Sequence, residues 1–282
     1  MSRKVSAPMS DLKARVLDDR LAPFERLCKL VEILRSPEGC PWDRVQTHAS
    51  LLPYLIEEAY EVIESVEAND YSALKEELGD LLVQIVFHAQ LAGERSDFTI
   101  SDSIGLIIDK LLRRHPHVFE ERRELRPSQV RDQWEKIKTE SGEKDSVLSG
   151  LPRTAPALTT AFRIGEKAGG VGFDWRKPDE ALAKVEEEIA EVRSELASDH
   201  PDRPQRLRAE FGDLLFAVAS SARLAGVDPE GALRQALEKF RTRFDRLERE
   251  VLADRGSFDK YTLDEMEAIW QAIKKGQLPD RQ

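Results

Sequence analysis

The sequence is poor in the residues and segments that mark several classes of protein. Its 282 residues include only two cysteines, Cys28 and Cys40, too few for a disulfide scaffold or for a zinc site built on cysteine alone. No apolar run approaches the roughly 18 residues that a membrane span needs, and residues 1–20 contain no apolar segment typical of a secretory signal. We therefore expect a cytoplasmic protein with reduced thiols and no membrane contact.

Two further absences limit the ligands. The 43 Lys and Arg residues are outnumbered by 53 Asp and Glu residues, and the net charge of −10 disfavours binding to a nucleic-acid polymer or an anionic membrane. The Gly-x-x-x-x-Gly-Lys-Ser/Thr loop of P-loop nucleotidases is also missing. A single nucleotide remains compatible with this charge, because a metal ion can bridge carboxylates and phosphate.

Apolar residues are present at helical rather than strand spacing. They make up 40% of the chain and recur every three or four residues over 53–68, 74–91, 178–196 and 206–224, whereas alternating β-branched runs are nearly absent. The pattern predicts an all-α protein.

The chain also repeats itself in order. Glu57–Val62 resembles Glu187–Val192, Glu77–Leu82 resembles Glu210–Leu215, and Leu91–Gly93 repeats as Leu224–Gly226; Lys110, Arg114, Trp134 and Lys138 then match Lys239, Arg243, Trp270 and Lys274. Five matches in order indicate a tandem duplication of one unit of domain size. We expect a flexible extension over 1–20, a first domain over 21–138, a linker over 139–155 and a second domain over 156–282.

Each copy carries five acids that a helix would bring together. In the second copy, the first three acids fall within one third of a helix circumference and the last two share a face of the next helix. The sets are Glu187, Glu188, Glu191, Glu210 and Asp213 in the second copy, and Glu57, Glu58, Glu61, Glu77 and Asp80 in the first. Such acids repel one another, and hard oxygen ligands suit Mg²⁺ or Mn²⁺. A di-iron site is disfavoured, because no histidine follows a glutamate at three residues.

A solvated acidic face is the alternative interpretation of any one of these motifs. The pairing of the two motifs, their recurrence in both halves and a glycine between the acids, Gly79 or Gly212, favour the metal site. A glycine inside a helix also predicts close approach of a second helix.

Basic residues accompany the acids of the second copy. Lys239 and Arg243 are one helical turn apart, as are Trp270 and Lys274, while Lys184 and Arg206 precede the two acidic motifs. Metal-loaded carboxylates bordered by cations suit a polyphosphate. Ordinary surface ion pairs, with the tryptophans packed in the core, are the alternative.

These features resemble the MazG family of nucleoside triphosphate pyrophosphohydrolases in its two-domain form. The resemblance covers about residues 20–276 and includes Gly39–Asp43, Gln46–Thr47, Arg113–Phe119 and Val171–Trp175. It implies an all-α bundle that forms a homodimer, and Mg²⁺-dependent hydrolysis of a broad range of nucleoside triphosphates to the monophosphate and pyrophosphate, as housekeeping of the nucleotide pool.

The resemblance also implies roles for residues of the second copy. Its five acids would be catalytic metal ligands or their supports, and Lys184, Arg206, Lys239, Arg243, Trp270 and Lys274 would contact substrate. Ala209 stands where relatives often have another glutamate, and Arg206 stands where lysine is common. The first copy has Tyr54 and Ala73 in place of Lys184 and Arg206, so we expect its site to be the weaker one.

The mechanism expected from these residues is attack of water on the α-phosphorus, with pyrophosphate leaving. Two other hypotheses remain open at this point. One is a helical oligomerisation module whose nucleotide site senses without turnover, and the other is a purely structural helical repeat.

Overall fold

The computed structural model describes residues 20–120, 122–126 and 146–276, together with residues 14, 16–17, 129–130, 133–134 and 137. This part of the chain contains helices and no strand, which confirms the predicted all-α class. None of the described helices has both the length and the apolar character of a membrane span. Most of the predicted extension over 1–20, residues 139–145 of the predicted linker and Lys138 lie outside the described residues.

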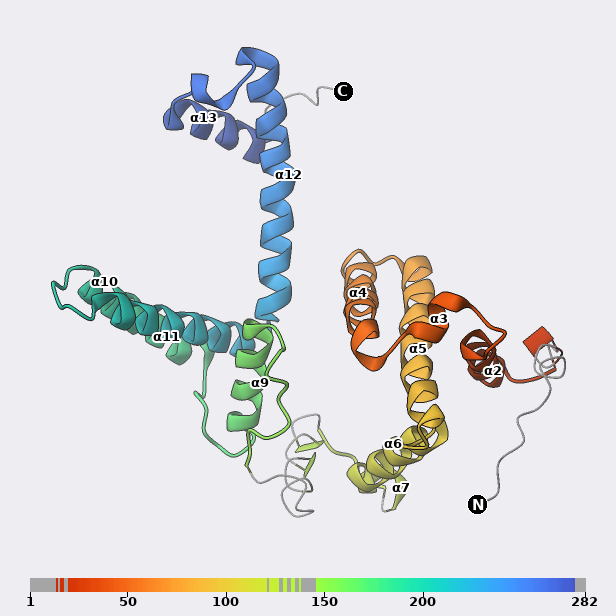
Figure 1. Ribbon diagram of the computed structural model, residues 1–282. Coiled ribbons are helices and arrows are strands. Elements are labelled where there is room, and N and C mark those ends of the chain that lie inside the picture. The colour runs from red at the N-terminus through yellow and green to blue at the C-terminus, as the bar shows by residue number, and fades with distance from the viewer. Residues whose placement is uncertain are drawn as a thin grey trace. The chain divides into compact units, whose positions relative to one another are not determined.

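The chain divides into two compact units, residues 1–123 and 124–282. The helices of the first unit, red to yellow in Figure 1, are α2 (Pro23–Arg35), α3 (Pro41–Val45), α4 (His48–Glu67), α5 (Tyr71–Glu94), α6 (Ile100–Arg114) and α7 (Pro116–Phe119). Those of the second unit, green to blue, are α9 (Ala157–Gly169), α10 (Pro178–Leu196), α11 (Arg203–Leu224), α12 (Pro229–Arg255), the 3₁₀ helix η1 (Phe258–Lys260) and α13 (Leu263–Lys274).

The α4–α5 hairpin of the first unit is defined by its caps. Thr47 Oγ1 accepts from the Ser50 amide, and Ser50 Oγ accepts from the Thr47 amide at 2.8 Å. The capping box starts this helix at His48, five residues before the segment 53–68 whose apolar spacing predicted a helix, and Pro53 lies inside the helix. Asp70 caps α5, and the turn between the helices passes through Asn69 with φ of +56°.

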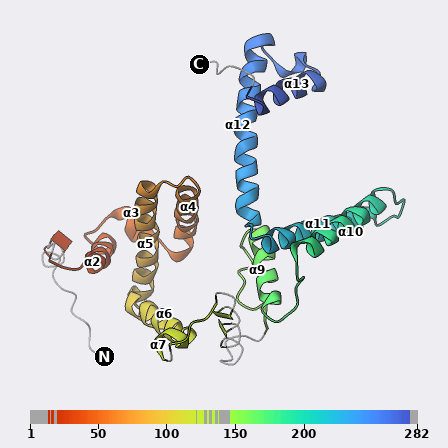
Figure 2. The ribbon, with the colours of Figure 1, turned by 180° about the vertical axis from the view of Figure 1, so that it is seen from behind.

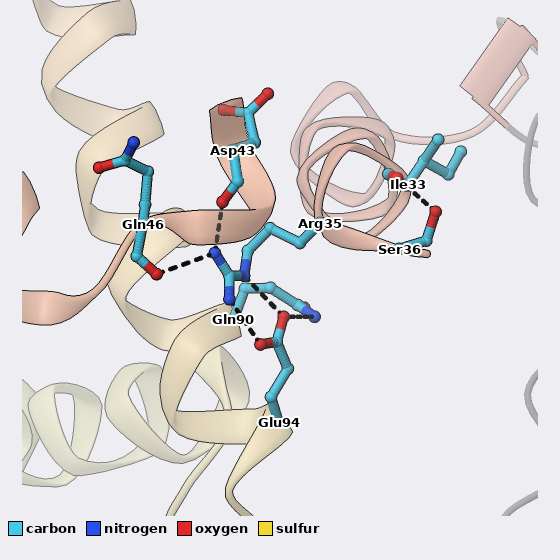
Figure 3. Close-up of polar contacts among 7 residues, drawn as sticks. All are labelled: Ile33, Arg35, Ser36, Asp43, Gln46, Gln90 and Glu94. Carbon is cyan, nitrogen blue, oxygen red and sulfur yellow. Dashed lines mark hydrogen bonds and ion pairs between the residues drawn. The ribbon is translucent and has the colours of Figure 1, made fainter. Parts of the chain in front are cut away.

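The core of the first unit lies between α2, α4 and α5. Its fully buried members are Val31, Leu51, Val86, Phe87 and Leu91. Arg35, at the end of α2, extends this packing into a polar network that Figure 3 shows in detail. Its guanidinium donates to both carboxylate oxygens of Glu94 on α5, at 2.7 and 2.8 Å, and to the Asp43 carbonyl of α3 at 2.5 Å.

The second unit pairs α10 with α11, as α4 pairs with α5, and both Figure 1 and Figure 2 show the two helices lying side by side. Helix α10 spans the segment 178–196, whose apolar spacing predicted a helix. Helix α12 begins at Pro229, where Asp228 caps its first amides, and ends at Gly256 with φ of +80°. Leu247, Val251 and Ile273 then bury the contact between α12 and α13.

A pair of histidines joins the start of α4 to α5 in the first unit. His48 Nδ1 lies 2.8 Å from His88 Nδ1, so one nitrogen donates a hydrogen and the other accepts it. His88 Nε2 is buried without a hydrogen-bond partner among the described residues. Burial, and secondly the neighbouring His48, lowers the pKa of His88. His48 opens α4, where the helix dipole also opposes a positive charge.

This pair predicts that the first unit loses stability in mild acid. The folded pKa of His88 is below its unfolded value of about 6.5, so its contribution is complete above that pH and is lost as the pH falls through the folded pKa. The thermal midpoint, measured between about pH 8 and pH 5, should fall more steeply for the parent than for His88→Phe. His200→Asn, at an exposed position of the second unit, serves as the control and should keep the parent's slope. Equal slopes for the parent and His88→Phe would contradict this prediction.

Candidate metal centre

Carboxylates from α10 and α11 meet in the second unit. One oxygen each from Glu188, Glu191 and Glu210 lies within 4.8 Å of the others. Glu187 and Asp213 are on the same two helices but are not members of this group. The structure thus brings three of the five predicted acids together, and these three residues are called the second cluster.

The second cluster contains a buried carboxylate whose negative charge is only partly compensated. Glu188 is 4% exposed, and its Oε2 is buried without a hydrogen-bond donor among the described residues. A hydrogen bond with Glu188, with burial as the second cause, raises the pKa of Glu191. An ionised carboxylate oxygen buried without a partner is costly, so the second cluster is built to receive a proton or a cation.

Lys184 offers part of the compensation from the same helix. Its ammonium lies 2.8 Å from both Glu187 Oε1 and Glu188 Oε1. The hydrogen bonds to Glu187 and then Glu188 raise the pKa of Lys184 well above its ordinary value. Lys184 therefore stays charged and neutralises one side of the cluster, while Glu188 Oε2 has no partner in the part of the chain that the structure describes.

The first unit repeats the arrangement with a different membership. One oxygen each from Glu58, Glu77 and Asp80, called the first cluster, lies within 4.8 Å of the others. Burial and then the Asp80 charge raise the pKa of Glu58, and burial and then Glu61 raise that of Glu77. Glu57 and Glu61, predicted for this site, act on Glu58 as neighbouring charges on α4.

The close helix approach that the sequence predicted at the glycines between the acids is not observed. A Cβ built at Gly79 or Gly212 would meet no described atom within 4 Å. The prediction of close packing at these positions is wrong within the described part of the chain. Gly79 and Gly212 instead face open space beside the clusters.

The predicted basic residues separate into two groups. Arg206, on α11, pairs with Glu195 of α10, whose side chain is 8% exposed, so this guanidinium joins the two helices. Lys239 and Arg243 lie on α12, more than two turns beyond its start, and Lys239 is exposed. In both ribbon views α12 runs away from α10 and α11.

Trp270 and Lys274 lie farther along the second unit. Their helix, α13, packs against the end of α12 that is remote from α10 and α11 (Figures 1 and 2). Trp270 packs on Phe240, with ring centroids 5.1 Å apart, and borders the core of α12 and α13. Lys274 is exposed. Within one chain, these four residues of α12 and α13 are not brought beside the second cluster.

A loop anchor in the second unit escaped the interpretation of the sequence. Arg223, on α11, donates to Asp174 Oδ1 at 2.7 Å and so holds the segment between α9 and α10. Helix α9 leaves room for this contact because it has glycine at positions 165 and 169. A Cβ at Gly165 would collide with Arg223, and one at Gly169 would lie 2.8 Å from Asp174 Oδ2. The four-residue spacing of these two glycines is the signal that could have indicated the contact.

The donor set fits a divalent ion in both units. Three convergent carboxylates offer hard oxygen ligands, and the unpartnered Glu188 Oε2 is the kind of atom that a cation would satisfy. The fold and the two clusters define a class of all-α proteins in which paired helices present acidic groups that could hold a metal ion.

Comparison with known proteins identifies the family within that class. The family model for the MazG nucleotide pyrophosphohydrolase domain matches residues 46–119 and 176–247, and these two stretches contain the first and second clusters. The chain belongs to the MazG family.

Relatives extend the likeness over most of the chain. The chain is 46% identical over 255 residues to the nucleoside triphosphate pyrophosphohydrolase/pyrophosphatase MazG of Thermotoga maritima, covering 90% of this chain and 96% of that protein. It is 43% identical over 259 residues to the nucleoside triphosphate pyrophosphohydrolase of Escherichia coli K12, covering 90% and 98%. A protein of the same name from Mycobacterium tuberculosis is 34% identical over 174 residues, covering 61% of this chain and 50% of that protein.

Proposed function

We propose that the protein is a Mg²⁺-dependent nucleoside triphosphate pyrophosphohydrolase that releases the monophosphate and pyrophosphate from a broad range of ribo- and deoxyribonucleotides in the cytoplasm. The observation that carries the proposal is the second cluster, with its buried and unpartnered Glu188 Oε2, inside a region that matches the family. The names of the relatives support the reaction class. The two domains of the proposal are 21–138 and 156–282, and each contains one match to the family.

Glu188, Glu191 and Glu210 would hold the metal in the second unit, with Glu187 and Asp213 as supports. Mg²⁺, or Mn²⁺ in its place, would supply charge neutralisation of the triphosphate and a more acidic water. The first cluster would hold a second ion more weakly. In these roles the metal ion would compensate the negative charge of the carboxylates that the fold itself leaves without a partner.

The chain's own groups would carry the remaining steps. One carboxylate of the group Glu187, Glu188 and Glu191 would orient the water and take its proton as it attacks the α-phosphorus. The substrate-binding residues would hold the phosphates and the nucleoside while charge develops on pyrophosphate. They are Lys184, Arg206, Lys239, Arg243, Trp270 and Lys274.

A homodimer is part of the proposal, because two helix faces of the second unit are apolar and exposed. On α11, Phe211, Leu215 and Val218 lie along one face and are 44%, 57% and 43% exposed. On α12, Leu233, Leu237, Phe240 and Phe244 form a similar stripe, 40–53% exposed. Apolar stripes of this length favour association with a second copy. We propose that a second copy also brings its own α12 and α13 toward the second cluster.

The two clusters are expected to contribute unequally to turnover. Glu188→Gln should lower kcat by at least about 100-fold, since it removes a charged ligand from the second cluster, which Lys184 borders. Glu58→Gln, the matched change in the first cluster, should leave most activity. Pyrophosphate release with a panel of triphosphates measures both variants. The assignment fails if Glu58→Gln abolishes turnover and Glu188→Gln does not.

Oxygen labelling tests the position of attack. Hydrolysis in ¹⁸O-water should place the label in the monophosphate, because the new P–O bond forms at the α-phosphorus. Mass spectrometry of both products reads the outcome. Label in pyrophosphate would mean attack at the β-phosphorus and would contradict the proposed reaction.

Sharing of the site between two copies can be tested by complementation. Glu188→Gln and Lys274→Ala should each be inactive alone. If Glu188 of one copy works with Lys274 of the other, their co-expression should restore roughly a quarter of parental activity, since half of the dimers are mixed and each has one intact site. Co-expressed chains no more active than either variant would show that the site lies within one copy.

A further inference from the structure

Two exposed aromatic side chains of the first unit lie in contact with each other. Trp42, on α3, meets Tyr54, on α4, edge to face with ring centroids 5.7 Å apart. The residues are 50% and 38% exposed. Large rings gain most from burial, so a pair that is positioned by the fold yet left at the surface is available to a ligand.

The register of α4 places Tyr54 on the face that carries the acids. Tyr54 precedes Glu57, Glu58 and Glu61 by three, four and seven residues, which is one face of a helix. Lys184 has the same register in α10, and its ammonium reaches Glu187 and Glu188 at 2.8 Å. Tyr54 therefore stands where the second unit has its cation.

The segment that carries Trp42 is anchored by polar contacts. Helix α3 has five residues and none of them is buried. The Arg35 guanidinium holds it by donating to the carbonyls of Asp43 at 2.5 Å and Gln46 at 3.3 Å, and Glu94 fixes the guanidinium in turn (Figure 3). Just before α3, a Cβ at Gly39 would collide with the Ile33 carbonyl, so the preceding turn is packed against α2. Trp42 is thus carried by a short segment that polar contacts hold in place.

We propose that Trp42 and Tyr54 form a nucleobase-binding platform, and that the first unit holds its nucleotide through the base where the second unit uses Lys184 toward phosphate. The inference rests on the proposed function in one respect, that the first cluster beside the platform receives a metal-bound triphosphate. An aromatic face accepts any base by stacking, and the triphosphate would reach the acids one helical turn away.

Charge favours a nucleotide over a protein as the occupant. A protein partner seated on the two rings would also cover Glu57 and Glu58, and burying unpaired carboxylates is costly. A metal-bound nucleotide brings compensating charge to the same carboxylates. Its base, which is flat and uncharged, matches the platform.

Calorimetric titration of the full chain with Mg²⁺ and α,β-methylene ATP, which resists cleavage between the α- and β-phosphorus, tests the platform. We expect two sites per chain, of which Trp42→Leu and Tyr54→Leu each weaken one at least tenfold and leave the other unchanged. Tyr60→Leu is the matched control, because Tyr60 lies on the same helix and is 41% exposed but six residues away, on another face. It should leave both sites intact.

A charge swap gives a second readout that does not depend on loss of binding. Tyr54→Lys should raise the affinity of the first unit for inorganic tripolyphosphate, by recreating the cation of the second unit, and should reduce its preference for ATP analogue over tripolyphosphate. Trp42→Leu should not change tripolyphosphate binding.

The platform is refuted by any of three results. These are a single nucleotide site in the parent, Trp42→Leu and Tyr54→Leu behaving as Tyr60→Leu does, or a change in molecular mass on Trp42→Leu with unchanged nucleotide affinity. Failure of the proposed function is separate, since it would appear as no pyrophosphate release from ATP by the parent. Two nucleotide sites, one of them dependent on Trp42, would uphold the platform even then.

Discussion

Carboxylates from two neighbouring helices come within 4.8 Å of one another in each unit, and their repulsion must be offset for the helix pair to hold. The hairpins α4–α5 and α10–α11 carry these acids: Thr47 and Asp70 cap the two helices of the first hairpin, whereas α10 and α11 each begin with a proline in the first turn and no side-chain cap. In the second unit Lys184 supplies part of the compensation and leaves Glu188 Oε2 without a partner. A divalent ion fits this deficit, and that deficit links the fold to the chemistry of a phosphate-cleaving enzyme.

The duplicated units meet the same constraint with different neighbours. Where α10 has Lys184, α4 has Tyr54 in contact with Trp42. The first cluster therefore lacks the cation of the second, and burial together with like charge raises the pKa of Glu58. One scaffold can hold similar acid sets and still offer a cationic border in one copy and an aromatic border in the other, because a position on the helix face can change without disturbing the cluster.

Each unit also anchors the segment that precedes its first acidic helix, and the two anchors are built differently. In the first unit Arg35 of α2 joins Glu94 of α5 to backbone carbonyls of α3 and Gln46. In the second unit Arg223 of α11 holds the Asp174 side chain over the glycines of α9. Both use a mostly buried guanidinium, since its fixed donor geometry can order a segment that has little apolar surface to bury.

The sequence by itself determined the features that are local: helical type, the tandem repeat, and the spacing of three and four residues that lets Lys184 reach Glu187 and Glu188. Tertiary structure alone decided which acids converge, so that Asp80 belongs to its cluster and Asp213 does not. It also decided that Arg206 forms an ion pair with Glu195 and that His48 forms a hydrogen bond with His88. Periodicity fixes the angular position of a side chain on its own helix. The rotation of one helix against another, and contacts distant in sequence, depend on packing that no local pattern encodes.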